Sequence, residues 1–433
     1  MRRGMVFGLL LVLIALTGPP APAAEKDRIP APAVVAINRA ETLMAAGKTR
    51  EAIDGLTAFQ AKGRDVSRKT ADSRGYTHYL IDFLLGNGCL TLGDPATAEK
   101  HFRAAVAKKP AFAEARFNLA RCLYDLNRPA EAGQAFVAAY EAAGAGNAEA
   151  LYYAAVCFMR AEDYPRALTA FDRLLAEHPQ ELTPDRRQTL ARLYLAMEEP
   201  ARALPHVELL AGQLDGQSQR EWREVLIYVY LQLDMTDKAL ARVDAFTRDD
   251  PLEARWWKIQ AWLLLQQQDY RRALTALTAY SYLQVPSGRE RELLGDVNFM
   301  AGVPVEAVRN YEKQLATAPD PALIRKTARG YLRLYDQDRA LALIERGLET
   351  APDDQDLLTM KGYLLYEAGR LDEAAAVYER LSTVDPQSGD HWLMRGYIAW
   401  QQGDLAAARR AFVRAAEFEA CAGRARKALE HLK

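Results

Sequence analysis

Apolar and small residues recur along most of the chain with the spacing of amphipathic helices. Residues 84–110 and residues 357–386 show the pattern clearly. Each segment has an apolar helical stretch, a glycine turn, an alanine, an aromatic residue four positions later and a closing proline. Because apolar residues at helical spacing form one buried face, the pattern predicts an all-α protein made of helix pairs joined by short turns.

The helix pair recurs about eleven times, and an alanine in the second helix sets the frame. Its members are Ala52, Ala98, Ala132, Ala167, Ala203, Ala239, Ala273, Ala307, Ala340, Ala374 and Ala408. The first step is 46 residues and all later steps are 33 to 36 residues. Two other columns test this frame independently. Twelve residues before each alanine a small residue stands in ten of the eleven units, with Ile227 as the exception, and four residues after it a large side chain stands in all eleven.

These columns have a physical reason. Small residues let the two helices of a unit approach closely, and we expect the large residue to fill the gap against the next unit. A proline twelve residues after the alanine ends the second helix in six units, because its ring is incompatible with a helix interior. Those prolines are Pro110, Pro179, Pro251, Pro319, Pro352 and Pro386.

The columns resemble the tetratricopeptide repeat, a 34-residue helix–turn–helix unit with small residues at positions 8 and 20 and a large one at position 24. The resemblance covers about residues 33–420 and implies a right-handed α-solenoid, because each unit buries its apolar face only by stacking on its neighbours. We expect residues 62–78, which are polar and charged, to be a loop or an extended helix start. The expected organisation is a signal peptide at 1–24, a short linker at 25–32, a first repeat at 33–61, a polar connection at 62–78, ten contiguous repeats at 79–420 and a basic C-terminal capping helix at 421–433.

The N-terminus carries the pattern of a secretory signal peptide. Arg2 and Arg3 precede a short apolar run, residues 5–16, and then the small-residue site Ala21-Pro22-Ala23. The run is too short for a membrane span, which needs about 20 residues, so we expect cleavage after Ala23 or Ala24 and a periplasmic location. An uncleaved N-terminal anchor is the alternative.

Charge and residue usage narrow the function classes. The formal net charge is −1, and it becomes −3 if Arg2 and Arg3 are removed with the signal peptide. A near-neutral chain is a poor match for nucleic acid, which demands many Lys and Arg contacts. The chain has only 6 His and 4 Cys, so the residue types that most often perform chemistry are scarce.

Candidate catalytic and metal-binding motifs are weak. Gly47-Lys48-Thr49 looks like the end of a phosphate-binding loop, but Thr42 stands where that motif needs glycine. The histidines show no metal spacing, and we expect His101 and His206 to be partly exposed. We therefore predict no enzyme activity, no cofactor and no metal site.

The cysteines fall mainly at equivalent positions of successive units. Cys89, Cys122 and Cys157 lie in first helices, and Cys421 lies near the C-terminus. Equivalent positions on stacked helices are about 8–10 Å apart, which is too far for a disulfide. We expect free buried thiols, and Cys122–Cys157 is the bridge that remains to be tested.

The repeat resemblance also implies where a partner would bind. In that family, positions 2, 5, 9, 12 and 13 of the first helix line a concave groove. The aromatic and arginine residues at these positions are the types enriched in binding hot spots, although packing between helices is an alternative role for them. They are Phe117, Arg121, Tyr124, Tyr152, Arg160, Arg192, Tyr228, Trp262, Phe299, Arg325, Arg329, Arg333, Tyr363, Tyr366, Tyr397 and Trp400.

Two details of this set carry further expectations. Arg325, Arg329 and Arg333 share one helical face, and Glu292 and Asp296 are the acids that would balance them if the row is only a solvated surface. Trp257 and Trp392 stand at position 4, where the family often has tryptophan, and we expect them in the core.

The expected function is a non-catalytic scaffold that binds a protein or peptide. Residues 254–277 and 292–315 resemble tetratricopeptide proteins of TonB/ExbB/ExbD energy-transduction systems in a tryptophan-led helix and in the turns Gln-x-Asp-Tyr and Gly-Val-Pro. That resemblance implies a periplasmic accessory of TonB-dependent transport with TonB, ExbB or ExbD as partners. The alternative is a scaffold for envelope polysaccharide assembly or export that binds glycan or synthase components.

Overall fold

The computed structural model describes residues 28–432, apart from residues 145 and 319, and over this part of the chain it consists of helices and turns without strands. The predicted all-α solenoid is therefore confirmed. The helices divide into two units, with the boundary between Leu233 and Asp234. The expected signal peptide lies outside the described residues. None of the helices in the described part is both long enough and apolar enough to cross a membrane.

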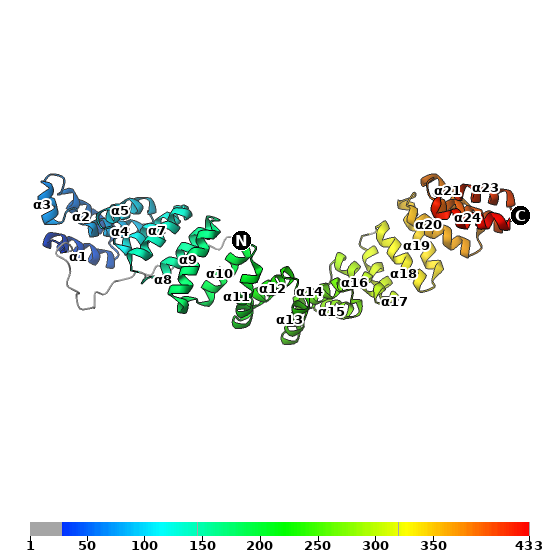
Figure 1. Ribbon diagram of the computed structural model, residues 1–433, viewed down its shortest axis with the longest axis horizontal. Helices are drawn as coiled ribbons and strands as arrows, with labels where there is room; N and C mark the ends of the chain where they lie inside the picture. Colours follow the sequence, from blue (N-terminus) through cyan, green and yellow to red (C-terminus); the bar gives the residue numbers. More distant parts are fainter. Residues whose placement is uncertain (1–27, 145, 319, 433) are drawn as a thin grey trace. The chain divides into compact units, whose positions relative to one another are not determined.

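Unit 1 contains five complete helix pairs, one short inserted helix and the first helix of a sixth pair (Figure 1). In chain order its helices are α1 (Ala31–Ala45), α2 (Thr49–Ala61), α3 (Arg68–Arg74), α4 (Tyr79–Thr91), α5 (Pro95–Lys108), α6 (Ala113–Asp125), α7 (Pro129–Ala142), α8 (Ala148–Arg160), α9 (Tyr164–Glu177), the 3₁₀ turn η2 (Pro179–Glu181), α10 (Pro184–Ala196), α11 (Pro200–Gln213) and α12 (Gly216–Gln232).

Unit 2 opens with the second helix of the sixth pair and continues through five complete pairs to a final helix (Figure 1). Its helices are α13 (Thr236–Asp249), α14 (Ala254–Gln266), α15 (Tyr270–Leu283), α16 (Gly288–Met300), α17 (Pro304–Leu315), α18 (Pro321–Arg333), α19 (Gln337–Thr350), α20 (Gln355–Glu367), α21 (Leu371–Val384), α22 (Gly389–Gln401), α23 (Leu405–Ala415) and α24 (Glu419–His431).

The small and large columns of the repeat meet inside each helix pair. A Cβ added to Gly86 would lie 2.7 Å from the ring of Phe102, and one added to Gly362 would lie 2.8 Å from the ring of Tyr378. Gly295 with Tyr311 and Gly396 with Phe412 make the same pairing. The large residue of position 24 therefore lies over position 8 of its own repeat, where we had expected it to fill the gap against the next one.

Every helix pair turns through a left-handed residue at the same register, five positions before the frame alanine. Glycine fills it five times, whereas six repeats place a residue with a side chain there at φ between 56° and 59°. The glycines are Gly47, Gly93, Gly302, Gly369 and Gly403, and the other residues are Asn127, Glu162, Glu198, Asp234, Gln268 and Tyr335. Because L-residues other than glycine pay a steric cost in this conformation, the turn geometry is imposed by the pair and not by the local sequence.

The connection at 62–78 is a folded insertion, where a loop or an extended helix start was predicted. Its helix α3 begins after Ser67, whose Oγ accepts a hydrogen bond from the backbone N–H of Thr70 at 3.3 Å. The helix ends at Gly75, where an added Cβ would lie 2.6 Å from the Cβ of Ala33 at the start of α1. A serine cap and a left-handed glycine are common helix boundaries, so a separate short helix replaces a longer α4.

The C-terminal helix α24 covers the apolar side of the last repeat. Its residues Ala425 and Ala428, and Leu432 directly after it, are buried in one cluster with Phe412 of α23. The outer residues of α24 are charged, as a solenoid end requires.

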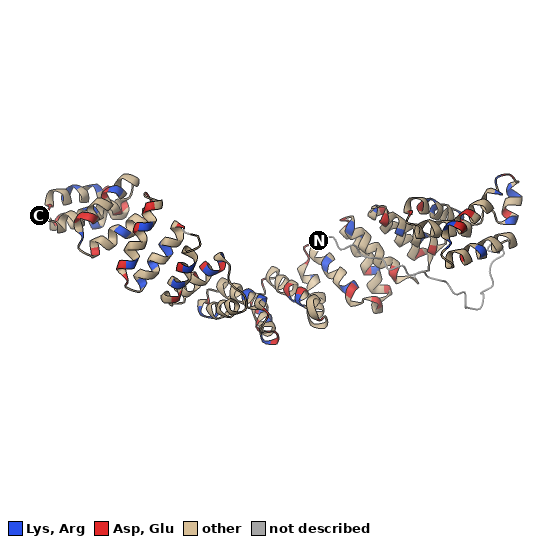
Figure 2. Ribbon diagram, turned by 180° about the vertical axis from the view of Figure 1, so that it is seen from behind, with Lys and Arg blue, Asp and Glu red and all other residues tan. Residues whose placement is uncertain are grey.

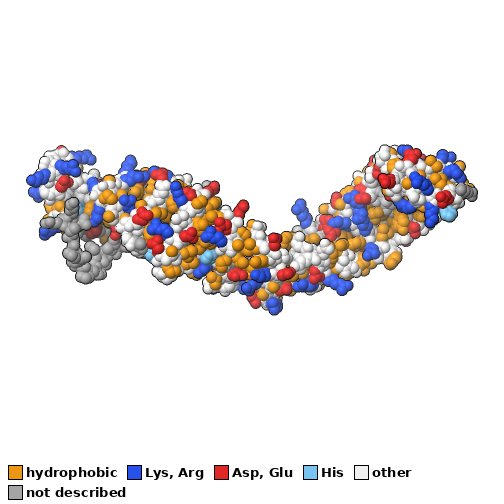
Figure 3. All heavy atoms as spheres, in the orientation of Figure 1, with side chains coloured by type: hydrophobic (Ala, Val, Ile, Leu, Met, Phe, Trp, Pro, Cys, Tyr) orange, Lys and Arg blue, Asp and Glu red, His pale blue; other side chains and the backbone are white. Residues whose placement is uncertain are grey.

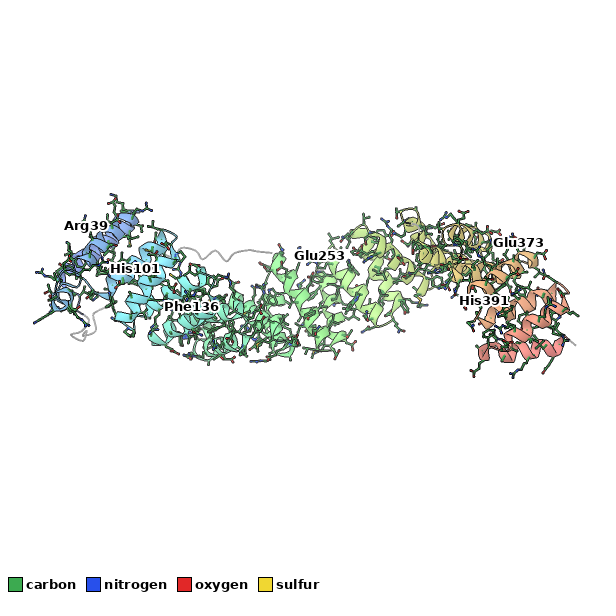
Figure 4. The ribbon with its side chains drawn as sticks, turned by 90° about the horizontal axis from the view of Figure 1, so that it is seen from above. Arg39, His101, Phe136, Glu253, Glu373 and His391 are labelled. Atoms are coloured by element: carbon green, nitrogen blue, oxygen red, sulfur yellow. The ribbon has the colours of Figure 1, made fainter. Side chains whose placement is uncertain are left out.

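Large buried side chains fill the space between helices of both units. Phe136 on α7, labelled in Figure 4, is 1% exposed. In unit 2 the core tryptophan is Trp256 and not the expected Trp257, whose indole N–H instead donates to the carbonyl of Pro251 at the surface. Trp392 is only partly buried, against the cluster that includes Phe412.

Candidate functional site

The predicted binding residues lie on the first helices α6, α8, α10 and α12 of unit 1 and α14, α16, α18, α20 and α22 of unit 2. Within each unit, we call the surface formed by its members of this set of sixteen residues the first-helix face of that unit. Successive first helices are linked by polar contacts, such as Asn87 with Asn118 at 2.8 Å in unit 1 and Tyr366 with Gln401 at 2.8 Å in unit 2. These contacts fix the register of neighbouring helices, so the exposed side chains between them have defined positions.

In unit 1, ring contacts occupy most of the predicted residues. Phe117 packs edge-on against Phe136, with ring centroids 5.0 Å apart. The guanidinium of Arg160 lies 4.7 Å from the ring centroid of Tyr124 in the preceding repeat, and an Arg160 N–H donates to the Asn127 side chain at 3.0 Å. Phe117 thus packs within its own repeat, whereas Arg160 joins two neighbouring repeats.

Tyr152 requires a correction, because it is buried and does not line an open surface. Its hydroxyl lies 3.2 Å from Thr189 Oγ1 on α10, and Arg186 lies over its ring at 5.2 Å. A tyrosine with its ring covered and its hydroxyl paired serves the interface between α8 and α10.

The remaining unit 1 residues differ in exposure. Arg192 is exposed but lies 5.6 Å from the ring centroid of the buried Trp222. Arg121 is half-buried and borders a small hollow with Tyr124. Tyr228 on α12 is exposed.

Four predicted aromatics of unit 2 are partly buried and take part in packing. Tyr397 and Trp400 both contact the ring of Phe412, at centroid distances of 5.1 and 6.3 Å. Phe299 packs on the core cluster around Tyr311, and the Tyr366 hydroxyl accepts a hydrogen bond from the Gln401 amide. These four residues contribute more to the solenoid than to an open surface.

Two other aromatics of unit 2 are open to solvent. Trp262 on α14 is 49% exposed and Tyr363 on α20 is 52% exposed. Both stand at position 9 of their repeats, and Arg329 on α18 stands at position 9 between them. Position 9 of α16, between Trp262 and Arg329, is Asp296, whose charge Lys326 balances. The row across unit 2 therefore presents two aromatic groups, one unpaired basic group and one paired acid.

The three arginines of α18 do not behave alike. Arg325 is half-buried and pairs with Asp354, the N-cap of α20, and with Asp356 at 3.4 Å. Arg329 and Arg333 are exposed, and neither forms an ion pair with a described residue. Arg325 therefore fixes α18 against α20, whereas the other two present unpaired positive charge.

The acids expected to balance this arginine row bind a different cation. Lys326 Nζ donates to Glu292 Oε1 and to Asp296 Oδ2, each at 2.7 Å. Asp296 also accepts from the Tyr311 hydroxyl at 2.8 Å, and this contact together with burial raises the pKa of Tyr311. The charge of Arg329 and Arg333 is thus left uncompensated. The sequence did hold a signal for this ion pairing, because Lys326 is adjacent to Arg325. Lys326 does not stand at one of the groove positions, so it was not considered. Figure 2 shows basic and acidic residues interspersed along the ribbon of both units.

Groups capable of chemistry are few, and the four cysteines among them are buried. Within the described residues no cluster of three or more His, Cys, Asp or Glu side chains could hold a metal ion. All four cysteines are free and buried, so Cys122 and Cys157 form no disulfide, and burial raises the pKa of each of these two thiols to about 12. Thiols with such pKa values are poor nucleophiles.

The histidines and the glycine-lysine-threonine sequence have structural positions. His101 and His206 are partly exposed, and burial lowers the pKa of both imidazoles. His391 on α22 is buried (Figure 4). Gly47 is the left-handed turn residue between α1 and α2, and Thr49 is the buried first residue of α2, so this sequence is a turn and not a phosphate loop.

Comparison with solved structures returns helical-repeat proteins at low identity. YrrB, a TPR protein with an unusual peptide-binding site, is 20% identical with a TM-score of 0.37, over 43% of this chain and 97% of that chain. Naa15/Naa10 bound to HypK gives 14% identity and a TM-score of 0.49, over 89% of this chain and 63% of that one. The C-terminal part of a TPR repeat-containing protein from Cytophaga hutchinsonii gives 15% identity and a TM-score of 0.44, over 55% of this chain and 98% of that chain. No curated protein matches the chain.

The family models match directly. One tetratricopeptide-repeat model matches residues 83–148, 224–283, 325–383 and 359–425, and a second tetratricopeptide-repeat model matches residues 149–181. These ranges take in repeats of both units and cover more than half of the sequence. Together with the helix pairs and their shared turn geometry, they show that the chain belongs to the tetratricopeptide-repeat family.

Proposed function

We propose that this protein is a non-catalytic scaffold whose unit 2 binds an acidic, extended segment of a partner protein on its first-helix face. The observation that carries the proposal is the unpaired charge of Arg329 and Arg333 on the same face of unit 2 as the half-exposed Trp262 and Tyr363. Membership of a family of interaction scaffolds that are generally non-catalytic agrees with this function.

The spacing of the row sets the size of the ligand. Trp262, Arg329 and Tyr363 lie on helices α14, α18 and α20, three repeat steps from first to last. Packed helices are roughly 10 Å apart, and an extended chain advances roughly 3.4 Å per residue. A segment of roughly nine residues would therefore reach all three side chains, with its carboxylates at Arg329 and Arg333 and apolar groups on the two rings.

The finer proposal is that the protein works in the periplasm as an accessory of TonB-dependent transport, with TonB, ExbB or ExbD as the partner. It is supported by the apolar N-terminal segment with its small-residue site, and by the resemblance of residues 254–277 and 292–315 to proteins of those systems. Cell fractionation with N-terminal sequencing tests the location: a periplasmic chain starting near Glu25 agrees with it, and a cytoplasmic chain retaining Met1 contradicts it.

The partner is tested by crosslinking from the proposed surface. A photoreactive phenylalanine analogue replaces Tyr363 in the living cell, and crosslinked partners are identified by mass spectrometry. Recovery of TonB or ExbD supports the proposal. Recovery of a glycan synthase or a porin in their place overturns it.

Charge reversal provides the matched controls. Replacing Arg329 and Arg333 with glutamate should reduce the crosslinked product at least tenfold without changing the helical signal. Arg410→Glu on α23 changes another exposed arginine, which lies on a second helix, and should leave the product unchanged. Equal yields from both variants would remove the arginines from the site.

The second candidate is a scaffold for envelope polysaccharide assembly or export. The exposed rings of Trp262 and Tyr363 favour it, because aromatic faces stack well on sugars, and the unpaired arginines would select an acidic glycan. Calorimetric titration with polygalacturonate and with a glutamate-rich peptide separates the two candidates: binding of the polysaccharide alone supports this one.

A further inference from the structure

We infer that the turns of the seventh to ninth repeats form a second docking surface, which takes a partner segment carrying a large apolar side chain beside a carboxylate. We call it the turn-edge surface and define it by Tyr270, Arg271, Met300, Val303, Val305 and Tyr335. It lies at the ends of the helices, where each first helix turns into its second, and it does not depend on the first-helix face.

A hollow of about 370 Å³ lies at the centre of this surface. Its walls are the turn between α14 and α15, from Gln268 to Arg271, and the turn between α16 and α17, from Met300 to Gly302. Met300 is exposed at its edge. The hollow is large enough for one aromatic or branched side chain, with Met300 and Ala301 as its apolar contacts. Figure 3 shows that hydrophobic side chains reach the surface of unit 2 between charged ones.

At this edge the eighth repeat has an unfavourable helix N-cap residue and an exposed apolar residue. Five other repeats place an aspartate at the N-cap of the second helix, where its side chain accepts a backbone N–H, as Asp94 and Asp269 do at 3.0 and 3.1 Å. The eighth repeat is one of six whose N-cap side chain makes no such bond, and its N-cap residue is the apolar Val303. Val305 beside it is 51% exposed. Valine is among the poorest N-cap residues. Residues that weaken local structure without gaining burial point to a function.

The turn of the ninth repeat also carries an unfavourable, exposed residue. Tyr335 is 93% exposed and holds the left-handed turn position at φ 59°, which five repeats fill with glycine. A bulky residue in this conformation is strained, and its ring gains almost no contact with its own chain. Two adjacent turns thus present large apolar groups to solvent at a cost in stability, which fits a surface covered by a partner.

The charges around the hollow select the occupant. Asp269 is engaged, because it accepts the Arg272 N–H and lies 3.8 Å from the Arg272 guanidinium. Arg271, which also lines the hollow, is exposed and forms no ion pair among the described residues. A carboxylate next to the inserted side chain would therefore find an unpaired cation. Two of the corresponding turns of unit 1 carry glutamates, Glu162 and Glu198, which would repel that carboxylate.

The test is a peptide selection on the full chain. A phage-displayed library of random 12-residue peptides is selected on the wild-type protein and counter-selected on a Met300→Lys, Val305→Lys variant. We expect enriched peptides in which Phe, Leu or Trp adjoins Asp or Glu, with at least tenfold weaker binding to the variant and to Arg271→Glu. The absence of enrichment, or peptides that bind wild type and variant equally, overturns the proposal.

Two further variants separate binding from folding. Val303→Asp supplies the missing N-cap, so it should melt no lower than wild type while losing at least fivefold in peptide affinity; unchanged affinity contradicts the surface. Leu405→Lys alters a 52% exposed residue of the corresponding turn in the last repeat and should leave binding unchanged.

Sedimentation equilibrium tests whether a second copy of the chain occupies the surface. If the wild type self-associates and the Met300→Lys, Val305→Lys variant does not, the surface belongs to a second copy and the peptide proposal is overturned.

Discussion

Arg160 and Arg192 in unit 1 stand on the same face of the first helices as Arg329 and Arg333 in unit 2, but their surroundings differ. The unit 1 arginines lie over aromatic rings of neighbouring repeats, at 4.7 and 5.6 Å from the ring centroids. The unit 2 arginines are exposed and unpaired within the described residues. The same residue type at the same repeat positions therefore stabilises the array in one unit and remains available to a ligand in the other.

This difference shows that residue type and repeat position do not identify a binding residue. What decides is whether the adjacent repeat supplies a partner. Tyr124 and Trp222 satisfy the unit 1 arginines, whereas Lys326 takes the acids that would have satisfied the unit 2 row. The four predictions below test how far the contrast extends.

The cores of the two units should respond alike. Phe102→Ala in unit 1 and Phe412→Ala in unit 2 each remove a fully buried ring that lies over a position-8 glycine. Each should cost about 3–5 kcal/mol, measured as faster hydrogen exchange in the affected unit. A change confined to one variant would show that the units differ in packing and not only in their surfaces.

Glu290 should make unit 2 acid-sensitive. It accepts bonds from Lys258, Tyr280 and the backbone of Ser287 at 2.6 to 2.8 Å, and so joins α14, α15 and α16; the lysine contact is the main reason that its pKa falls to about 2. Because the folded-state pKa lies below the ordinary value of 4.5, this stabilisation is full above pH 4.5 and is lost as the pH falls towards 2.

Glu290→Gln should therefore cost about 1–3 kcal/mol at neutral pH and flatten the pH dependence between 4.5 and 2, as followed by urea unfolding. A variant that keeps the wild-type acid profile would show that another carboxylate is responsible. Glu306→Gln, which alters an exposed carboxylate at the start of α17, is the control.

Arginine substitutions should separate stability from binding. Arg160→Gln and Arg192→Gln should each lower stability by about 0.5–1 kcal/mol, the usual value of an exposed cation–π contact, without affecting the ligand of unit 2. Arg329→Gln and Arg333→Gln should do the reverse. Thermal melts and the crosslinking yield from position 363 give the two readouts, and the contrast fails if all four variants behave alike.

The smallest effect is expected at the turns. Glu162→Gly in unit 1 and Tyr335→Gly in unit 2 relieve a left-handed side-chain residue, and each should raise stability by about 0.5 kcal/mol after the entropy cost of glycine. Gly369→Ala should do the opposite. Differential scanning calorimetry can detect a change in melting temperature of this size. A loss of stability in Tyr335→Gly would mean that the Tyr335 ring contributes to the fold.

The fold was accessible from sequence because it depends on columns that repeat. The small residue, the frame alanine and the large residue recur about eleven times. Stacking of the helix pairs is one of the few ways to bury all of these side chains. The inserted helix α3 escaped prediction because it occurs once, and its Ser67 cap and Gly75 end are signals too short to stand out in a polar segment. Trp256 was missed because the family pattern favours the adjacent position.

The binding surface was less accessible, because side-chain availability depends on the neighbouring repeat. Nothing in the local sequence distinguishes Arg325, which holds two aspartates, from Arg329. The turn-edge residues carried a readable signal that the search for aromatic and arginine residues passed over: large apolar residues such as Met300 and Val305 stand where other repeats have polar or small ones.

The shared left-handed turn has a consequence for how this chain can vary in length. The turn always lies five residues before the frame alanine, although the repeats themselves differ by up to three residues. All of that variation must fall between one repeat and the next, as at η2 and around Gly144. The helix hairpin therefore has a constant length, and only the links between repeats vary. Insertions, tags and new segments should be tolerated in these links. A single residue added within a hairpin would rotate every later helix out of its packing register.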